Sequence, residues 1–304
     1  MKNIRVGIPR ALLYYRYADA WKTFIEELGY EVITSPETTA GILKDGIKKR
    51  VGDLCLPVKT FLGHVESLKD SVDFLFIPRY ISVEHDAYMC PKILGLPDVV
   101  RACFTNLPRI IDPMFNIKKD KDNTITEFSR QVARILSLEP EAVEKSFIKN
   151  SGAGYMNEQE EYSLTDKKIN VGLIGRPYLL FDRYLGKNLF RTLSELGANP
   201  VYIQPSENEI TEAMTVIPKW VYWSMGKEVT ASAHAFFKDD KIDGIINICS
   251  ATCGPDSFTG DLIRKRLNTR NKPYMTLSVD EHASDTGIQT RVEAFVDMIG
   301  KVIV

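Results

Sequence analysis

A chain of 304 residues, 44% hydrophobic and 26% charged, is long enough to bury a sizeable core and suggests about two domains. The formal net charge is −1, with acidic and basic residues intermixed, which argues against a general affinity for nucleic acid or anionic membranes. The first residues offer no secretion signal, and the apolar runs are too short to span a bilayer. A cytoplasmic protein is therefore predicted.

Strand-like and helix-like segments alternate along the whole chain. In the first half, strands are predicted at residues 4–8, 31–34 and 74–78, with helical stretches between them. In the second half, strands are predicted at residues 169–174, 200–203, 244–250 and 274–279, and helices at residues 185–196, at 257–267 and from about Ile288. This alternation predicts an α/β fold of two similar Rossmann-like (flavodoxin-like) domains, each with a parallel sheet, and a cleft between them.

Residues 149–168 are polar, contain glycine and show little periodicity, which is typical of a linker between domains. We place the boundary near Asp166. The N-terminal α/β domain then covers residues 1–165 and carries Cys55 and Cys90. The C-terminal α/β domain covers residues 166–304 and carries Cys253.

The two halves also share a sequence pattern. VGIPRALL at residues 6–13 matches VGLIGRPYLL at residues 171–180, and the Glu-Leu-Gly of residues 27–29 recurs at residues 195–197. A strand, a turn, a helix and a Leu-Gly cap are common in α/β proteins, but several matches in the same order predict an internal duplication.

The chain contains five cysteines, an odd number that argues against a disulfide framework and for metal, redox or catalytic use of some of them. Cys90 and Cys253 each follow a predicted strand and precede a proline and a helix. This is the carboxyl edge of a sheet, where open α/β folds bind ligands, and helix N-termini there favour thiolate over thiol. Cys55 is likewise followed by a proline and a helical run.

Three thiolates suit an iron–sulfur cluster and leave one iron for substrate, solvent or a non-cysteine ligand. Separate buried thiols are the alternative, and structural zinc with His85 as fourth ligand is another. Core packing is the favoured interpretation for Cys103 and Cys249. Cys249 lies only four residues before Cys253, however, so it is a possible extra ligand.

The chain resembles the uncharacterised family named after activators of 2-hydroxyacyl-CoA dehydratases, in the segments IPRALLYY, CLPVKTFLGH, IPRYISVE, CPKILGLPDV, GRPY, CGPDSF and SVDEHASDTGIQTRVEAF. It is more distantly similar to the cluster-binding subunits of those dehydratases, to benzoyl-CoA reductase subunits and to double-cubane cluster proteins. The resemblance implies that Cys55, Cys90 and Cys253 converge on one cluster. It also implies an ATP-hydrolysing electron donor with its own cluster.

The chain departs from these relatives in two respects. Its five cysteines fall short of the six thiolates expected for a double cubane, so a single 4Fe-4S cluster is expected. It also lacks a G-x-x-x-x-G-K-[ST] loop, the phosphate-binding signature of an activating ATPase. We therefore expect an electron acceptor or scaffold without an ATPase of its own.

Other polar residues follow the predicted strands. Glu281 and His282 come after residues 274–279, as candidate acid/base or cluster-supporting groups, and Arg291 is a candidate anion ligand. A capped, solvated turn is the alternative. Three arginines also follow strands in similar contexts and either bind an anion or pair with carboxylates and carbonyls, namely Arg10, Arg79 and Arg176. His64 and His85 are candidate fourth ligands, or packed and surface residues.

The predicted function is a low-potential electron-transfer or reductase component of the 2-hydroxyacyl-CoA dehydratase type, acting under anaerobic conditions. Any enzymatic activity is expected to be that of an oxidoreductase or radical-type dehydratase component, on a small molecule or acyl-CoA, with homodimerisation plausible. The main alternative is a non-catalytic accessory module with structural zinc. A third is a ligand-binding protein of periplasmic-binding shape that closes about a hinge.

Overall fold

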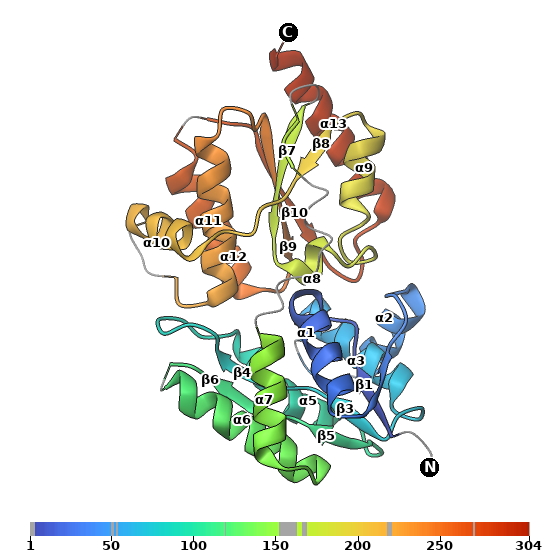
Figure 1. The fold of residues 1–304 in the computed structure, drawn as a ribbon. Helices are drawn as coiled ribbons and strands as arrows, with labels where there is room; N and C mark the ends of the chain where they lie inside the picture. Colours follow the sequence, from blue (N-terminus) through green and yellow to red (C-terminus); the bar gives the residue numbers. More distant parts are fainter. Residues whose placement is uncertain are drawn as a thin grey trace. The chain divides into compact units, whose positions relative to one another are not determined.

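Two compact units, Met1–Asn157 and Glu158–Val304, make up the chain in a computed structural model. The structure describes residues 4–49, 52, 54–118, 120–151, 163–165, 169–217, 221–269 and 271–303. Each unit has its own four-stranded parallel sheet with helices packed against it, which confirms the predicted α/β class (Figure 1). The predicted boundary at Asp166 lies outside the described residues.

The first unit contains β1 (Arg5–Ile8), α1 (Tyr14–Glu27), β2 (Glu31–Thr34), α2 (Ala40–Ile47), α3 (Leu56–Leu68), β3 (Phe74–Phe76), β4 (Arg79–Ser82), α4 (Pro91–Leu94), α5 (Leu96–Cys103), β5 (Arg109–Ile111), β6 (Met114–Asn116), α6 (Lys121–Leu136) and α7 (Pro140–Ser151). The sheet order is β2-β1-β3-β5, and all neighbours are parallel. Residues 149–151, predicted as linker, belong to α7.

Two prolines divide the strands of the first unit. Pro78 separates β3 from β4, Pro113 separates β5 from β6, and β4 and β6 form a second, two-stranded parallel ladder. The amide of Ile77 donates to the carbonyl of Ile111 at 2.9 Å, and that of Arg79 to the carbonyl of Pro113 at 2.9 Å. Because proline has no amide hydrogen, the ladder breaks there and the strands change sheet.

Aromatic rings hold α1, α6 and α7 together. The rings of Phe128 and Phe147 lie 4.4 Å apart, and Phe24 meets Phe147 edge to face at 5.6 Å. At the end of α1, the Glu27 carboxylate accepts hydrogen bonds from Ser146 Oγ at 3.0 Å and Asn150 Nδ2 at 2.9 Å. This part of the core of the first unit is thus aromatic, and α7 packs against α1.

The second unit contains β7 (Asn170–Gly175), α8 (Pro177–Leu180), α9 (Leu189–Glu195), β8 (Asn199–Val201), α10 (Glu207–Val216), α11 (Ser224–Lys238), β9 (Gly244–Ser250), α12 (Gly254–Leu262), the π-helix η2 (Ile263–Leu267), β10 (Tyr274–Val279) and α13 (Asp285–Ile303). The sheet order is β8-β7-β9-β10, all parallel. In Figure 1, α11 and α12 lie on one side of this sheet and α9 and α13 on the other. Nearly every residue of β7 and β9 is buried, which explains their unbroken apolar sequences.

Three helix starts differ from the prediction. The predicted helix at residues 185–196 begins only at Leu189, because Asp182 binds the amides of Tyr184 and Leu185 and holds the preceding residues in a turn. α12 begins at Gly254 rather than near residue 257, since the proline after it suits a first turn. The last helix begins before Ile288, where Ser284 Oγ accepts the amide of Gly287 at 3.0 Å.

Both four-stranded sheets have the same strand order, 2-1-3-4, when only the strands of each sheet are numbered in chain order. This agreement fits the repeated sequence pattern. Strand order reverses between β1 and β3 in the first sheet, and between β7 and β9 in the second. Open α/β sheets bind ligands at such switch points, beyond the carboxyl ends of the strands. Among the described residues, no helix is long and apolar enough to cross a membrane.

Candidate functional site

Each of the three predicted cluster ligands sits immediately before a helix. Cys55 is the N-cap of α3, Cys90 of α4 and Cys253 of α12, and each of these helices carries a proline in its first turn. The three thiols are partly exposed and none is in a disulfide. The arrangement of cysteine, proline and helix expected from the sequence is therefore present at all three positions.

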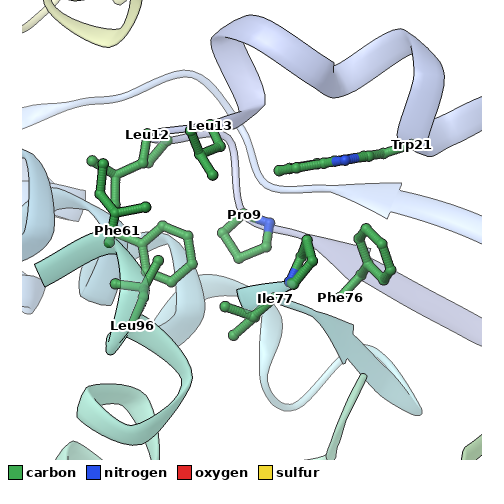
Figure 2. Close-up of a pocket in the computed structure, with 11 residues that line it drawn as sticks. Pro9, Leu12, Leu13, Trp21, Phe61, Phe76, Ile77 and Leu96 are labelled. Atoms are coloured by element: carbon green, nitrogen blue, oxygen red, sulfur yellow. The ribbon is translucent and has the colours of Figure 1, made fainter. Parts of the chain in front are cut away.

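In the first unit, the helices that follow Cys55 and Cys90 converge on one end of the sheet. A small apolar cavity there is lined by Phe61 of α3 and Ile93 of α4, together with Pro9 after β1 and Pro78 after β3. Figure 2 shows Phe61 and Leu96 beside Pro9, with Trp21 and Phe76 completing the lining. Its volume of about 10 Å³ is enough for about one water molecule. The cavity is therefore a small packing gap between these elements and too small for a ligand.

The position of α3 is fixed by an unusually close crossing with α2. A Cβ built on Gly46 would lie 1.8 Å from the carbonyl oxygen of Lys59, and one on Gly63 would lie 2.0 Å from that of Ile42. Only glycine allows the two backbones to approach so closely. These glycines therefore set the place of the helix that Cys55 caps.

His64, on α3, is fully buried and bonded at both ring nitrogens. Nδ1 lies 2.9 Å from Ser35 Oγ and Nε2 lies 3.0 Å from Thr38 Oγ1. Burial, aided by the charge of Arg10, lowers the pKa of His64 to about 3. Of the two interpretations open for His64, the packed residue is confirmed, because both ring nitrogens are used to tie α3 to the segment after β2. His85 is exposed in the loop before Cys90, and its role as a ligand stays a prediction.

Around Cys253, a buried ion pair links the ends of two central strands. Arg176, which follows β7, is 2% exposed, and its Nε donates to Asp256 Oδ1 at 2.5 Å. The other carboxylate oxygen of Asp256 faces the amide of Ser250 at 3.5 Å. Asp256 lies in the first turn of α12, so the pair ties the helix that Cys253 caps to the switch point of the second sheet.

Burial, together with the Asp256 carboxylate, raises the pKa of the Cys253 thiol to about 12, against the opposing effect of Arg176. The expectation that the helix N-terminus favours thiolate is therefore wrong for Cys253, because desolvation and a nearby negative charge exceed the opposing effects of Arg176 and the Asp256 amide. Burial likewise raises the pKa of Cys249 and of Cys103. Asp256 also raises the pKa of Cys249, so both thiols of the second unit lie in the field of one carboxylate.

The three arginines that follow strands all meet carboxylates. Arg10 Nη2 lies 3.1 Å from Glu37, and Arg79 forms a two-pronged pair with Asp98 at 2.7 and 2.9 Å. Arg176 pairs with Asp256, as described above. Of the two interpretations open from the sequence, pairing with carboxylates is confirmed for each of them.

The residues after β10 form a turn that leads into α13. The amide of His282 donates to Asp280 Oδ1 at 2.8 Å, and the His282 side chain is exposed. Arg291 Nη2 donates to the carbonyl of Thr276 at 2.8 Å, which ties α13 to β10, and its role as an anion ligand stays a prediction. Glu281 and His282 thus follow a strand end as expected, and their catalytic role stays a prediction.

Sequence reasoning did not identify Asp256, Ser35 or Thr38 as partners of site residues. The place of Asp256 three residues after Cys253 is nevertheless a usable signal. Over the described ranges, no three His, Cys, Asp or Glu side chains gather closely enough to hold a metal ion. A centre shared by Cys55, Cys90 and Cys253 would combine ligands from both units and stays a prediction.

Comparison with known proteins gives two family matches. The family described as "CoA enzyme activase uncharacterised domain (DUF2229)" matches residues 5–204, more than half of the chain. The family described as "2-hydroxyglutaryl-CoA dehydratase, D-component" matches residues 196–299. These matches confirm the resemblance seen in the sequence motifs. No curated protein matches the chain.

Among solved structures, the chain aligns with the dinucleotide-forming acetyl-coenzyme A synthetase 1 of Ca. Korarchaeum cryptofilum, in complex with phosphate and ADP. The identity is 11% and the TM-score 0.20. The match covers 97% of this chain and 61% of that chain. A similarity with so low a TM-score supports no conclusion about the fold or the function of this chain.

Proposed function

The chain belongs to the family of the CoA enzyme activase uncharacterised domain, related to acyl-CoA dehydratases, and from this premise we propose that it is an iron–sulfur electron-transfer or reductase component. Cys55, Cys90 and Cys253 would hold one 4Fe-4S cluster. The cluster would supply one-electron transfer at low potential.

The observation that carries this proposal is the shared placement of the three cysteines. Each is the N-cap of a helix with a proline in its first turn, and each thiol is partly exposed. Thiolates are the ligands that iron–sulfur clusters prefer. The donor set therefore fits the proposed cluster.

The remaining residues would act around the cysteines. The Arg176–Asp256 pair anchors the helix that Cys253 caps, and the paired glycines of α2 and α3 anchor the helix that Cys55 caps. Glu281 and His282 are the proposed proton-transfer groups, since they follow β10 at its carboxyl end. The substrate class, a small molecule or an acyl-CoA, is part of the proposal.

An ATP-dependent activator is the proposed electron donor. The motif that would give this chain its own phosphate-binding loop is absent from its sequence, so ATP hydrolysis is assigned to the partner. A reducing cytoplasmic setting suits cysteines that must stay available as ligands.

The test uses protein purified without oxygen and reduced with dithionite. We expect an electron paramagnetic resonance signal of a reduced cluster in the wild type. The control variant Cys103→Ala, which removes one thiol outside the proposed ligand set, should keep this signal. Cys90→Ala should lose that signal. Stoichiometric zinc without iron in the wild type would instead establish the accessory-module alternative and overturn the proposal.

A further inference from the structure

We propose that Arg176 and Ser250 are positioning residues that donate hydrogen bonds to the sulfur atoms of the cluster at Cys253 and raise its reduction potential, an inference that rests on the proposed function.

The location of these residues is the first support. Arg176 directly follows β7 and Ser250 is the last residue of β9, and β7 and β9 are the neighbours between which the strand order reverses. Cys253 caps α12 just after β9. All three residues therefore belong to the switch point of the second sheet, where α/β folds bind their ligands.

Two buried polar atoms without partners are the second support. Arg176 Nη2 and Ser250 Oγ are buried, and neither has a hydrogen-bond partner among the described residues. Both residues are 2% exposed. A buried donor without an acceptor is destabilising, because it has lost its hydrogen bonds to water, and a charged donor is more so. Such a cost is usually removed by a ligand, an ion or a water molecule.

Asp256 accounts for only part of the Arg176 guanidinium. Its Oδ1 accepts a hydrogen bond from Nε of Arg176, and its Oδ2 faces the amide of Ser250. Both carboxylate oxygens therefore have a partner other than Nη2 of Arg176. The charge of Arg176 also acts on the Cys253 thiol. The guanidinium thus lies within electrostatic reach of the sulfur, and its Nη2 is the donor left over.

A cavity beside the pair offers a competing explanation. It is lined by Arg176, Asn247, Asp256 and Thr259 among others, and its volume of about 10 Å³ suits one water molecule. If that water alone satisfied Nη2, Arg176 would act on a cluster through its charge alone, and Arg176→Lys, which keeps the charge, would have the wild-type potential. Measurement of the reduction potential therefore separates the two explanations.

The direction of the expected shift in reduction potential follows from the charges involved. Reduction adds an electron to the cluster, so a nearby cation and hydrogen-bond donors stabilise the reduced form and raise the potential. Removal of either donor should shift the midpoint potential to a more negative value. Lysine keeps the charge of Arg176 but lacks its planar fork, so Arg176→Lys should give a smaller shift than Arg176→Gln.

The experiment is an anaerobic redox titration of the full chain, with iron content measured for every variant. We expect more negative midpoint potentials in Arg176→Gln and Ser250→Ala, each measured on the cluster-containing fraction of the protein. Arg191→Gln, which removes an exposed arginine of the same unit, is the matched control and should keep the wild-type potential. Ser250→Ala removes only a buried unpartnered hydroxyl, so it tests the inference even if Arg176→Gln does not fold.

Midpoint potentials of both variants equal to that of Arg191→Gln, with the cluster fully present, would overturn this inference and leave the proposed function intact. A wild-type protein without a cluster would overturn both.

Discussion

The buried imidazole of His64 ties two parts of the first unit together. Its ring bridges Ser35 Oγ and Thr38 Oγ1, and Ser35 Oγ also accepts the amide of Arg10 at 2.7 Å. One side chain on α3 thereby connects to the residues that follow β1 and β2. A protonated ring would bring an uncompensated charge into this buried network, next to the positive Arg10.

This arrangement predicts a loss of stability in acid. The folded-state pKa of His64, about 3, lies below its ordinary value of 6.5, so the unfolded chain takes up the proton first as the pH falls. The His64 contribution is therefore present above pH 6.5 and is lost between about 6.5 and 3, by at most about 1.4 kcal/mol per pH unit. Urea unfolding across this pH range measures it.

The comparison variants are His64→Gln and His85→Gln. We expect His64→Gln to flatten the dependence of unfolding free energy on pH within that window, while His85→Gln controls for the loss of an exposed imidazole. Equal slopes in wild type and His64→Gln would show that the buried ring does not titrate in this way.

At the residue scale, the sequence was informative where the signal is local. The cysteine, proline and helix order at Cys55, Cys90 and Cys253 can be read from neighbouring letters. The partners of His64 and Arg176 cannot, because Ser35 and Asp256 reach them through tertiary folding. The raised pKa of Cys253 was missed for the same reason, since burial and Asp256 are both set by the folded unit.

At the scale of elements, the crossing of α2 and α3 is the feature that determines the place of Cys55. The two helices meet through Gly46 and Gly63, each of which faces a backbone carbonyl of the other helix. Helical periodicity predicts that both segments fold as helices. It does not predict which glycine is needed for contact, since Gly41 on the same helix has open surroundings.

Gly63→Ala is predicted to destabilise the protein. The new methyl group would meet the carbonyl of Ile42 at 2.0 Å, so the helices must separate, at a cost of about 1–3 kcal/mol. Gly41→Ala is the control, because its Cβ would meet only Thr39 Oγ1 at 3.5 Å and alanine favours a helix. Denaturant unfolding should show a lower free energy for Gly63→Ala than for Gly41→Ala, and the reverse order would refute the role of the crossing.

At the scale of the whole molecule, each unit contributes thiols at its own sheet. Alternation of apolar runs was sufficient to predict two α/β units, because buried parallel strands are apolar along their length. Helix starts were predicted less well, since capping by Ser284 and turn formation by Asp182 depend on single side chains. The central claim at this scale is the proposed cluster, which would have ligands from both units.

Iron and acid-labile sulfide per chain, measured on anaerobically purified protein, test this claim most directly. We predict about four of each in the wild type and in Cys103→Ala, and their loss in both Cys55→Ala and Cys253→Ala, because the proposed centre would take ligands from both units. Full iron and sulfide in Cys253→Ala, or wild-type protein that contains no iron, would contradict the account.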